Sequence, residues 1–143
     1  MKTLAALLLL SLSLPAAKKT IVPPEFAATA ATAPYSPGIL VDGTLYVSGT
    51  IGQDLKTSAV PSDFEQEVKV CLERIGLVLK AAGMKFEDVV SVQVYLTDME
   101  LFPRMNAVYT TVFKSPRPAR TTVGVTKLAS AAAHVEITVT ARK

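Results

Sequence analysis

Residues 117–141 place the strongest constraint on the fold, because apolar and polar side chains alternate along them as they do in β-strands. In the second half of this segment, three apolar residues share one side, Val135, Ile137 and Val139, and four polar residues share the other, His134, Glu136, Thr138 and Thr140. In the first half, Thr122 and Gly124 share one side. The pattern predicts two strands joined by an alanine-rich loop, with one charged residue placed for chemistry in each, Arg120 and Glu136.

The sequence before residue 62 predicts a β-hairpin. Asp42–Gly43 separates two apolar runs, 39–41 and 44–49, and both residue types tolerate the positive φ angles that a two-residue hairpin turn requires. We expect the second strand to end at Ser48–Gly49. An arm rich in Ala, Thr and Pro precedes the hairpin at 18–32 and contains a candidate short strand at 20–22.

Two helices and a further strand are predicted between the hairpin and the last two strands. The first helix begins at a capping box over 62–65, ends at Gly83, and carries apolar residues at helical spacing, Phe64, Val68, Cys71, Ile75 and Leu79. Residues 89–97 alternate as a strand with one covered face. Pro103 then suits the first turn of a second helix that runs to about Phe113.

This order of elements predicts an α+β fold in which one mixed sheet has two helices on one face. Half of the 143 residues are hydrophobic, which is enough for the core of a single domain over 18–143. The other face of the sheet also carries apolar residues, which a monomer would leave in water. We therefore expect self-association, most often symmetric.

The first 17 residues have the layout of a secretory signal peptide. Lys2 is followed by an apolar run from Leu4 to Leu14 and then by small residues. The run is too short to span a membrane, which requires about 20 residues. We expect cleavage near Ala16 or Ala17, and a periplasmic or secreted protein that has no membrane attachment after cleavage.

Charge and cysteine content narrow the classes of function. The formal charge is +3, and the grouping of Lys114, Arg117 and Arg120 is a weak signal for nucleic acid. The single cysteine, Cys71, lies on the buried stripe of a predicted helix and excludes an intramolecular disulfide and a cysteine zinc cluster. The single histidine, His134, has no metal-ligand partner at useful spacing, so it is interpreted as an exposed residue at the start of a strand. No metal site is predicted.

Considered one by one, the candidate residues have ordinary structural interpretations. Most arginines and glutamates are solvated or form ion pairs, so the spacing of Arg120 and Glu136 alone predicts ordinary surface or ion-pair residues. Tyr35 in a turn is usually a packing residue, and Asn106 near a helix often makes only local hydrogen bonds. Ser48–Gly49 can be a simple strand end.

The surroundings of these residues resemble the Rid family of reactive intermediate deaminases, also called the YjgF family. The matching segments are TyrSerProGly at 35–38, ValSerGly at 47–49, MetAsnAlaValTyr at 105–109, ProAlaArgThrThrValGlyVal at 118–125 and ValGluIle at 135–137. The resemblance implies a chorismate mutase-like fold and a homotrimer with ligand clefts between subunits. It also implies a hydrolase of the 2-iminobutanoate/2-iminopropanoate deaminase type, which converts enamines and imines such as 2-aminoacrylate to 2-keto acids and ammonia without metal or cofactor.

The resemblance also implies roles for individual residues. Arg120 corresponds to the arginine that holds the substrate carboxylate, and Glu136 to the glutamate that handles water and protons. The substrate-binding positions are Tyr35, Ser48, Gly49, Asn106 and Thr122. Thr122 stands where many members carry cysteine, and the loop at 129–133 has one extra residue.

Two alternatives to the deaminase remain open. The same cleft can hold 2-keto acids or other small carboxylates without turnover. An RNA-directed role, as a ribonuclease or translation inhibitor, is the second, and the scattered positive charge and the predicted export argue against it.

Overall fold

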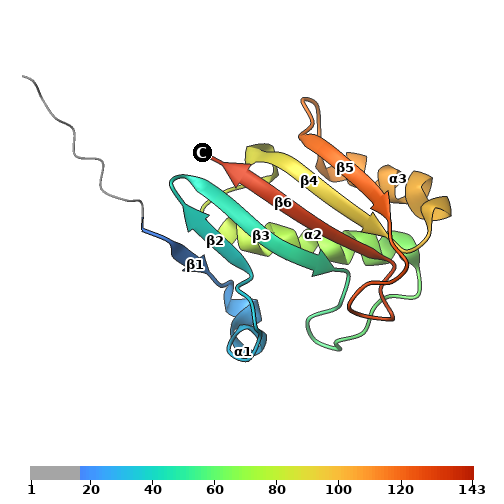
Figure 1. The fold of residues 1–143 in the computed structure, drawn as a ribbon, viewed down its shortest axis with the longest axis horizontal. Coiled ribbons are helices and arrows are strands. Elements are labelled where there is room, and N and C mark those ends of the chain that lie inside the picture. The colour runs from blue at the N-terminus through green and yellow to red at the C-terminus, as the bar shows by residue number, and fades with distance from the viewer. Residues whose placement is uncertain (1–16) are drawn as a thin grey trace, which may run out of the picture.

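The strands form where apolar and polar residues alternate in the sequence, and they assemble into one sheet (Figure 1). The computed structural model of the protein describes residues 17–143, so the predicted signal peptide lies almost entirely outside the described residues. In this part of the chain the strands are β1 (Lys19–Ile21), β2 (Gly38–Val41), β3 (Thr44–Ile51), β4 (Val89–Leu96), β5 (Ala119–Gly124) and β6 (Val135–Arg142). The α-helices are α1 (Ala27–Ala30), α2 (Phe64–Ala81) and α3 (Phe102–Val112), and short 3-10 turns cover Pro24–Phe26, Phe86–Asp88 and Met99–Leu101.

The sheet is mixed, with the order β1-β2-β3-β6-β4-β5. All neighbouring strands are antiparallel except β4 and β5, which are parallel. The two strands predicted from residues 117–141 are therefore not neighbours, because β4 lies between them. The helices α2 and α3 lie behind the sheet in Figure 1 and cover one face, which confirms the predicted α+β architecture.

The hairpin of β2 and β3 turns at Asp42 and Gly43, whose φ angles are 48° and 69°. This confirms the predicted turn. The end of its second strand is predicted wrongly, because β3 continues past Ser48–Gly49 to Ile51. Between Val47 and Thr50 the register against β6 shifts by a β-bulge. The extra residue lets the strand resume pairing at Thr50, opposite Ile137.

The helix α2 begins one residue later than its predicted capping box. Asp63 is the N-cap, and its carboxylate accepts a hydrogen bond from the backbone N–H of Gln66 at 2.8 Å, so Ser62 does not have the predicted role. Aspartate caps a helix as well as serine does, and it adds a negative charge at the positive end of the helix dipole. At the other end, Gly83 adopts a φ of 70°, and the N–H of Met84 donates to the carbonyl of Leu79 at 2.8 Å.

The core lies between the sheet and the two long helices. Val135, Ile137 and Val139 of β6 are fully buried, as their alternation predicts, and Cys71 of α2 is buried among them. Glu67 is also fully buried, on a stripe of α2 that the sequence pattern treats as apolar. Its carboxylate accepts hydrogen bonds from the N–H groups of His134 and Val135 at 2.7 and 3.1 Å, and fixes the start of β6.

The face of the sheet opposite α2 and α3 is called the open face here. Tyr46 and Val123, each of which alternates with residues that point toward the helices, are 53% and 40% exposed. These apolar groups in water agree with the expectation of self-association, which stays a prediction. Across residues 17–143, the helices are either too short or too polar to cross a membrane.

Candidate active site

Glu136 lies on the open face of the sheet and lines a hollow of about 510 Å³. In β6 it is opposite Ile51 of β3 and Tyr95 of β4. The hollow, called the Glu136 pocket here, is lined by Tyr35, Ser48, Gly49, Ile51, Ala129, Ser130 and Glu136. Three of the predicted substrate-binding residues therefore meet the predicted catalytic carboxylate.

The bulge in β3 builds one wall of this pocket. The Ser48 hydroxyl donates to the carbonyl of Ser36 at 2.7 Å, and the Ser48 N–H donates to the carbonyl of Pro37 at 3.0 Å. These bonds fix the turn that carries Tyr35, whose ring is 61% exposed at the rim. Gly49 lies directly against the Glu136 carboxylate, because a Cβ atom at position 49 would overlap its Oε1 atom. Glycine is therefore required for Glu136 to occupy this place.

Arg120 lies in a different hollow, of about 390 Å³, between β5 and α3. Its lining residues, which define the Arg120 pocket, are Asn106, Tyr109, Thr110, Arg117, Pro118 and Arg120. The guanidinium carbon lies 4.5 Å from the ring centre of Tyr109 and 5.6 Å from that of Phe102. Both rings lie within the range of a cation–π attraction, which restrains the position of the guanidinium.

The charge in the Arg120 pocket is not neutralised by a carboxylate. Within residues 17–143, no acidic group lies within ion-pair distance of Arg120 or Arg117. Burial raises the pKa of Tyr109, while the positive charges of Arg120 and Arg117 favour its ionised form. The pocket therefore has the positive charge and the N–H donors that a small anion would need.

One subunit does not bring Arg120 and Glu136 together. Arg120 is in register with Val92, whose side chain is buried toward the helices, whereas Glu136 is in register with Tyr95 on the open face. The predicted site is thus divided: Tyr35, Ser48 and Gly49 join Glu136, and Asn106 joins Arg120. Thr122 lines neither pocket, and its hydroxyl is buried without a hydrogen-bond partner.

Three residues near the site have contacts that the sequence interpretation missed. His134 is exposed, as expected, but its Nδ1 atom lies 2.9 Å from Oε2 of the buried Glu67. Arg74 of α2 is half-buried and lines a small cavity together with Tyr35 and Ser48. The sequence does indicate that Glu67 is buried, because Glu67 lies between Phe64 and Val68, which belong to the buried stripe of α2.

Burial raises the pKa of the Cys71 thiol well above its usual range, as suits a core residue.

Comparisons with known proteins agree with this geometry. The sequence model of the family described as Endoribonuclease L-PSP matches residues 26–143. The 2-iminobutanoate/2-iminopropanoate deaminase of Bos taurus is 43% identical over 102 residues, which are 71% of this chain and 74% of that protein. The RutC family protein SSO3206 of Saccharolobus solfataricus is 44% identical over 111 residues, which are 77% of this chain and 87% of that protein.

A similar solved structure is that of YyfA from Yersinia pestis, described as a protein of unknown function of the conserved Rid protein family. It has a TM-score of 0.82 and 34% identity, and the match covers 89% of this chain and 100% of that one. The likeness supports the fold described above.

The comparisons also correct the predicted localisation. The prediction of a periplasmic or secreted protein is wrong, because the homologues are mostly cytosolic. It rested on the layout of residues 1–17, which precede the matched region and lie almost entirely outside the described residues. The predicted signal peptide over 1–17 receives no support from the comparisons.

Proposed function

Since this chain belongs to the Rid (YjgF) family, described as Endoribonuclease L-PSP, we propose that it hydrolyses enamines and imines of amino acids to 2-keto acids and ammonia. Imine deaminases with about two fifths of their residues identical support such activity in general terms. The observation that supports the proposal is that the chain presents two separate hollows, one with Arg120 and Arg117 free of carboxylate partners within residues 17–143, and one with the Glu136 carboxylate on the open face.

The proposed site forms between subunits. If the Arg120 pocket of one subunit packs against the Glu136 pocket of the next, both charged groups face one cavity. A cyclic homotrimer would contain three such sites, because each subunit contributes both kinds of pocket. The exposed side chains of Tyr46 and Val123 on the open face support an interface there.

Arg120 would hold the substrate carboxylate. Two parallel N–H···O bonds to an imino acid fix both the position and the plane of the carboxylate, which a lysine cannot do. Such bonds are worth about 1.5 to 3 kcal/mol each. The cation–π contacts with Tyr109 and Phe102 support this role, because they restrain the guanidinium that would hold the carboxylate. Asn106 lines the same pocket and is proposed to contact the ligand.

Glu136 would move the protons. The electron pair of the enamine C=C bond takes a proton at the β-carbon, while the nitrogen lone pair forms the C=N bond of the protonated imine. Water then adds to the imine carbon and gives up a proton to form a carbinolamine. Its nitrogen takes up a proton, the C–N bond breaks as ammonia leaves, and the hydroxyl loses its proton as C=O forms. A carboxylate in a partly desolvated pocket can accept and return these protons, and such catalysis typically contributes about 10² to 10⁴ in rate.

The remaining predicted residues would shape the pocket. Gly49 allows the close approach of Glu136, Ser48 holds the turn, and Tyr35 borders the opening. The proposed contact of Thr122 with the substrate has the weakest support, because its hydroxyl is buried away from both pockets.

The test is the release of ammonia and keto acid from imino acids generated in place by an L-amino-acid oxidase. We expect the parent protein to accelerate release and both Arg120→Ala and Glu136→Ala to lose the acceleration. A folded variant that releases ammonia as fast as the parent would refute the proposed mechanism. No acceleration by a protein that still binds 2-keto acids would instead favour a non-catalytic carboxylate-binding role.

A further inference from the structure

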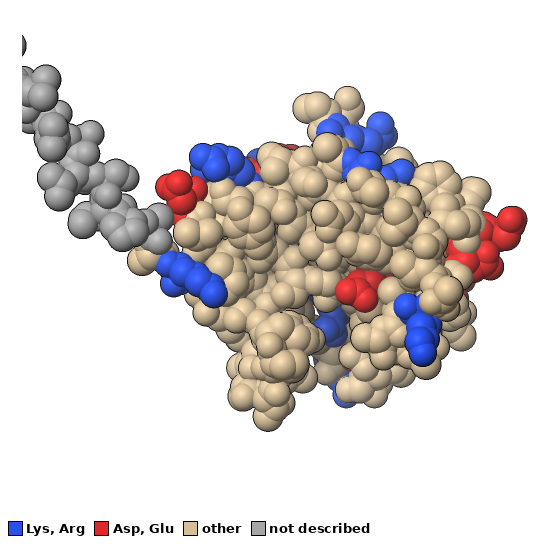
Figure 2. Space-filling view, viewed as in Figure 1, with Lys and Arg blue, Asp and Glu red and all other residues tan. Residues whose placement is uncertain are grey.

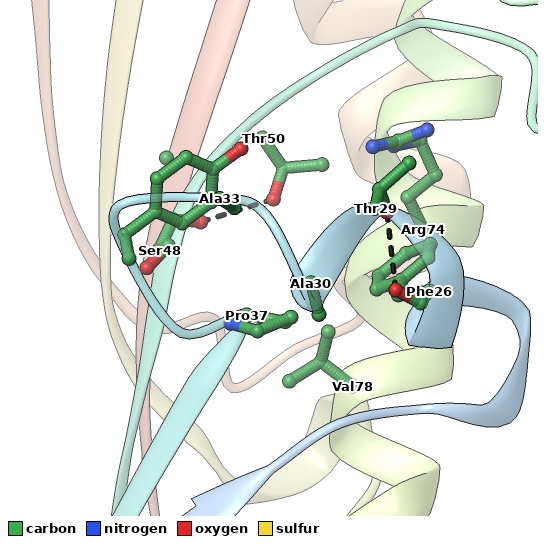
Figure 3. A pocket seen from close by; sticks show the side chains of 11 residues that line it. Phe26, Thr29, Ala30, Ala33, Pro37, Ser48, Thr50, Arg74 and Val78 are labelled. Carbon is green, nitrogen blue, oxygen red and sulfur yellow. Dashed lines mark hydrogen bonds between the residues drawn. The ribbon is translucent and has the colours of Figure 1, made fainter.

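A second cavity adjoins the Glu136 pocket and contains a cation that the proposed mechanism does not use. It has a volume of about 50 Å³ and shares Tyr35, Ser48 and Gly49 with the Glu136 pocket. Figure 3 shows Arg74 of α2 beside Phe26 and Thr29, across the cavity from Ser48 and Thr50 of β3. Arg74 is the only charged residue among its lining residues.

The guanidinium of Arg74 has donors that the protein does not satisfy. Its Nη1 donates to the carbonyl of Gln53 at 2.8 Å, and its carbon atom lies 5.0 Å from the ring centre of Phe26. Its Nε atom is buried without a hydrogen-bond partner. In the part of the chain that the structure describes, no carboxylate lies within ion-pair distance of Arg74.

An unpaired cation of this kind is costly. Burial lowers the pKa of Arg74, although arginine keeps its charge in proteins. The half-buried guanidinium keeps its hydrogen bond to Gln53, but its buried Nε–H group loses hydration that no other hydrogen bond replaces. The hydroxyls of Thr29, Ser48 and Thr50 each donate to a backbone carbonyl, so among the described lining residues Arg74 is the one charged donor for an anion, with the Tyr35 hydroxyl as a neutral one.

The cavity adjoins the open face because it shares Tyr35, Ser48 and Gly49 with the Glu136 pocket. These residues lie where the pairing of β2 with β3 ends, at Gly38 and Val47. On this face, Figure 2 shows a hollow with a basic group at its floor and an acidic group at its rim. A ligand whose reacting carbon lies at Glu136 can therefore extend past Tyr35 and Ser48 toward Arg74.

The volume limits what can enter. A water-sized group needs about 10 to 15 Å³, so the cavity holds roughly three to five such groups. A carboxylate with one or two methylenes has this size, and the apolar walls formed by Phe26, Ala30 and Val78 suit the methylenes.

We propose that Arg74 binds a second carboxylate, so that the site prefers imino acids derived from dicarboxylic amino acids. The inference rests on the proposed function: the first carboxylate binds Arg120 of a neighbouring subunit, the C=N bond lies at Glu136, and the distal carboxylate reaches Arg74. Arg74 is then the residue that determines specificity for the side chain of the substrate.

Calorimetric titration of the stable keto-acid products tests this without turnover. We expect the parent protein to bind 2-oxoglutarate at least 10-fold more tightly than 2-oxobutanoate, which lacks the second carboxylate. Loss of the charge-assisted bonds in Arg74→Gln should weaken 2-oxoglutarate binding roughly 10- to 150-fold and leave 2-oxobutanoate binding unchanged. Lys80→Gln, which removes an exposed cation from the same helix, is the matched control and should change neither affinity.

The outcomes separate this inference from the deaminase itself. Equal binding of the two keto acids by the parent, or equal weakening of both in Arg74→Gln, would overturn the role of Arg74. Unchanged 2-oxobutanoate binding also shows that the variant is folded. Ammonia release is measured in parallel. If the parent releases no ammonia but still prefers 2-oxoglutarate, the proposed deaminase activity is refuted while the proposed carboxylate site at Arg74 is supported.

Discussion

Replacing Gly49 by alanine should separate the chemistry of the site from its stability. The added Cβ atom would overlap Oε1 of Glu136, which is the far end of a flexible side chain, so the carboxylate can move aside while the backbone stays in place. Gly49 does not have a left-handed φ angle, so alanine fits its backbone conformation. We expect the free energy of unfolding to change by less than about 1 kcal/mol, because alanine also restricts the unfolded chain.

The effect of Gly49→Ala on activity should be much larger. A displacement of about 1 Å at a catalytic group can lower the rate about 100-fold, and we expect a loss of that order in kcat/KM for imine hydrolysis. The matched control is Gly52→Ala, whose Cβ atom would overlap the backbone carbonyl of Glu67. Because backbone cannot move aside easily, this variant should lose about 1 to 3 kcal/mol of stability.

The two variants are compared by urea unfolding and by ammonia release per folded molecule. A Gly49→Ala protein that keeps the stability and also the full kcat/KM of the parent would show that the position of the Glu136 carboxylate does not matter for the reaction.

Three further predictions concern the support of the site and its assembly. Glu67→Ala leaves the N–H groups of His134 and Val135 without their acceptor, so urea unfolding should show that the free energy of unfolding falls by about 2 to 5 kcal/mol. Glu67→Gln keeps an acceptor oxygen and should lose less. Equal stability of Glu67→Ala and the parent would contradict this prediction. The pKa of Glu65 is lowered to about 2, mainly because its carboxylate accepts a hydrogen bond from Arg104, so the stability that Glu65 contributes is complete above the unfolded value of 4.5 and is lost as the pH falls through about 2. The difference in Tm between the parent and Glu65→Gln should therefore shrink at acid pH. A difference that grows at acid pH would contradict this prediction. Light scattering should give three times the chain mass of 15.2 kDa, and Val123→Asp should lower that mass by placing a charge on the open face; a monomeric parent would refute the shared site.

The sequence predicts local geometry well wherever a single strand or turn determines it. The burial of Val135, Ile137 and Val139 follows from alternation because β6 lies inside the sheet, with the helices on one face. Asp42 and Gly43 determine their turn through their own φ angles. The end of β3 was predicted wrongly because the bulge at Ser48–Gly49 depends on its partner β6 and on the Glu136 side chain, which lie almost 90 residues later in the sequence.

The separation of Arg120 from Glu136 could not be predicted from alternation. The pattern shows which residues of one strand share a side, but it does not show how the sides of two strands correspond. That relation depends on β4, which lies between β5 and β6 and pairs in parallel with one and antiparallel with the other. The roles of Arg74 and Glu67 were not predicted, because the sequence pattern of a helix does not show which distant residues its charged side chains contact in the folded chain.

Subunit mixing tests whether Arg120 and Glu136 of different subunits form one site. Arg120→Ala and Glu136→Ala proteins are each expected to be inactive in ammonia release. After they are unfolded together in equal amounts and refolded, we expect about a quarter of the parental activity, because each site in a mixed ring takes Arg120 from one subunit and Glu136 from its neighbour. A mixture of folded oligomers that contain both variants and remain inactive would contradict a site shared between subunits.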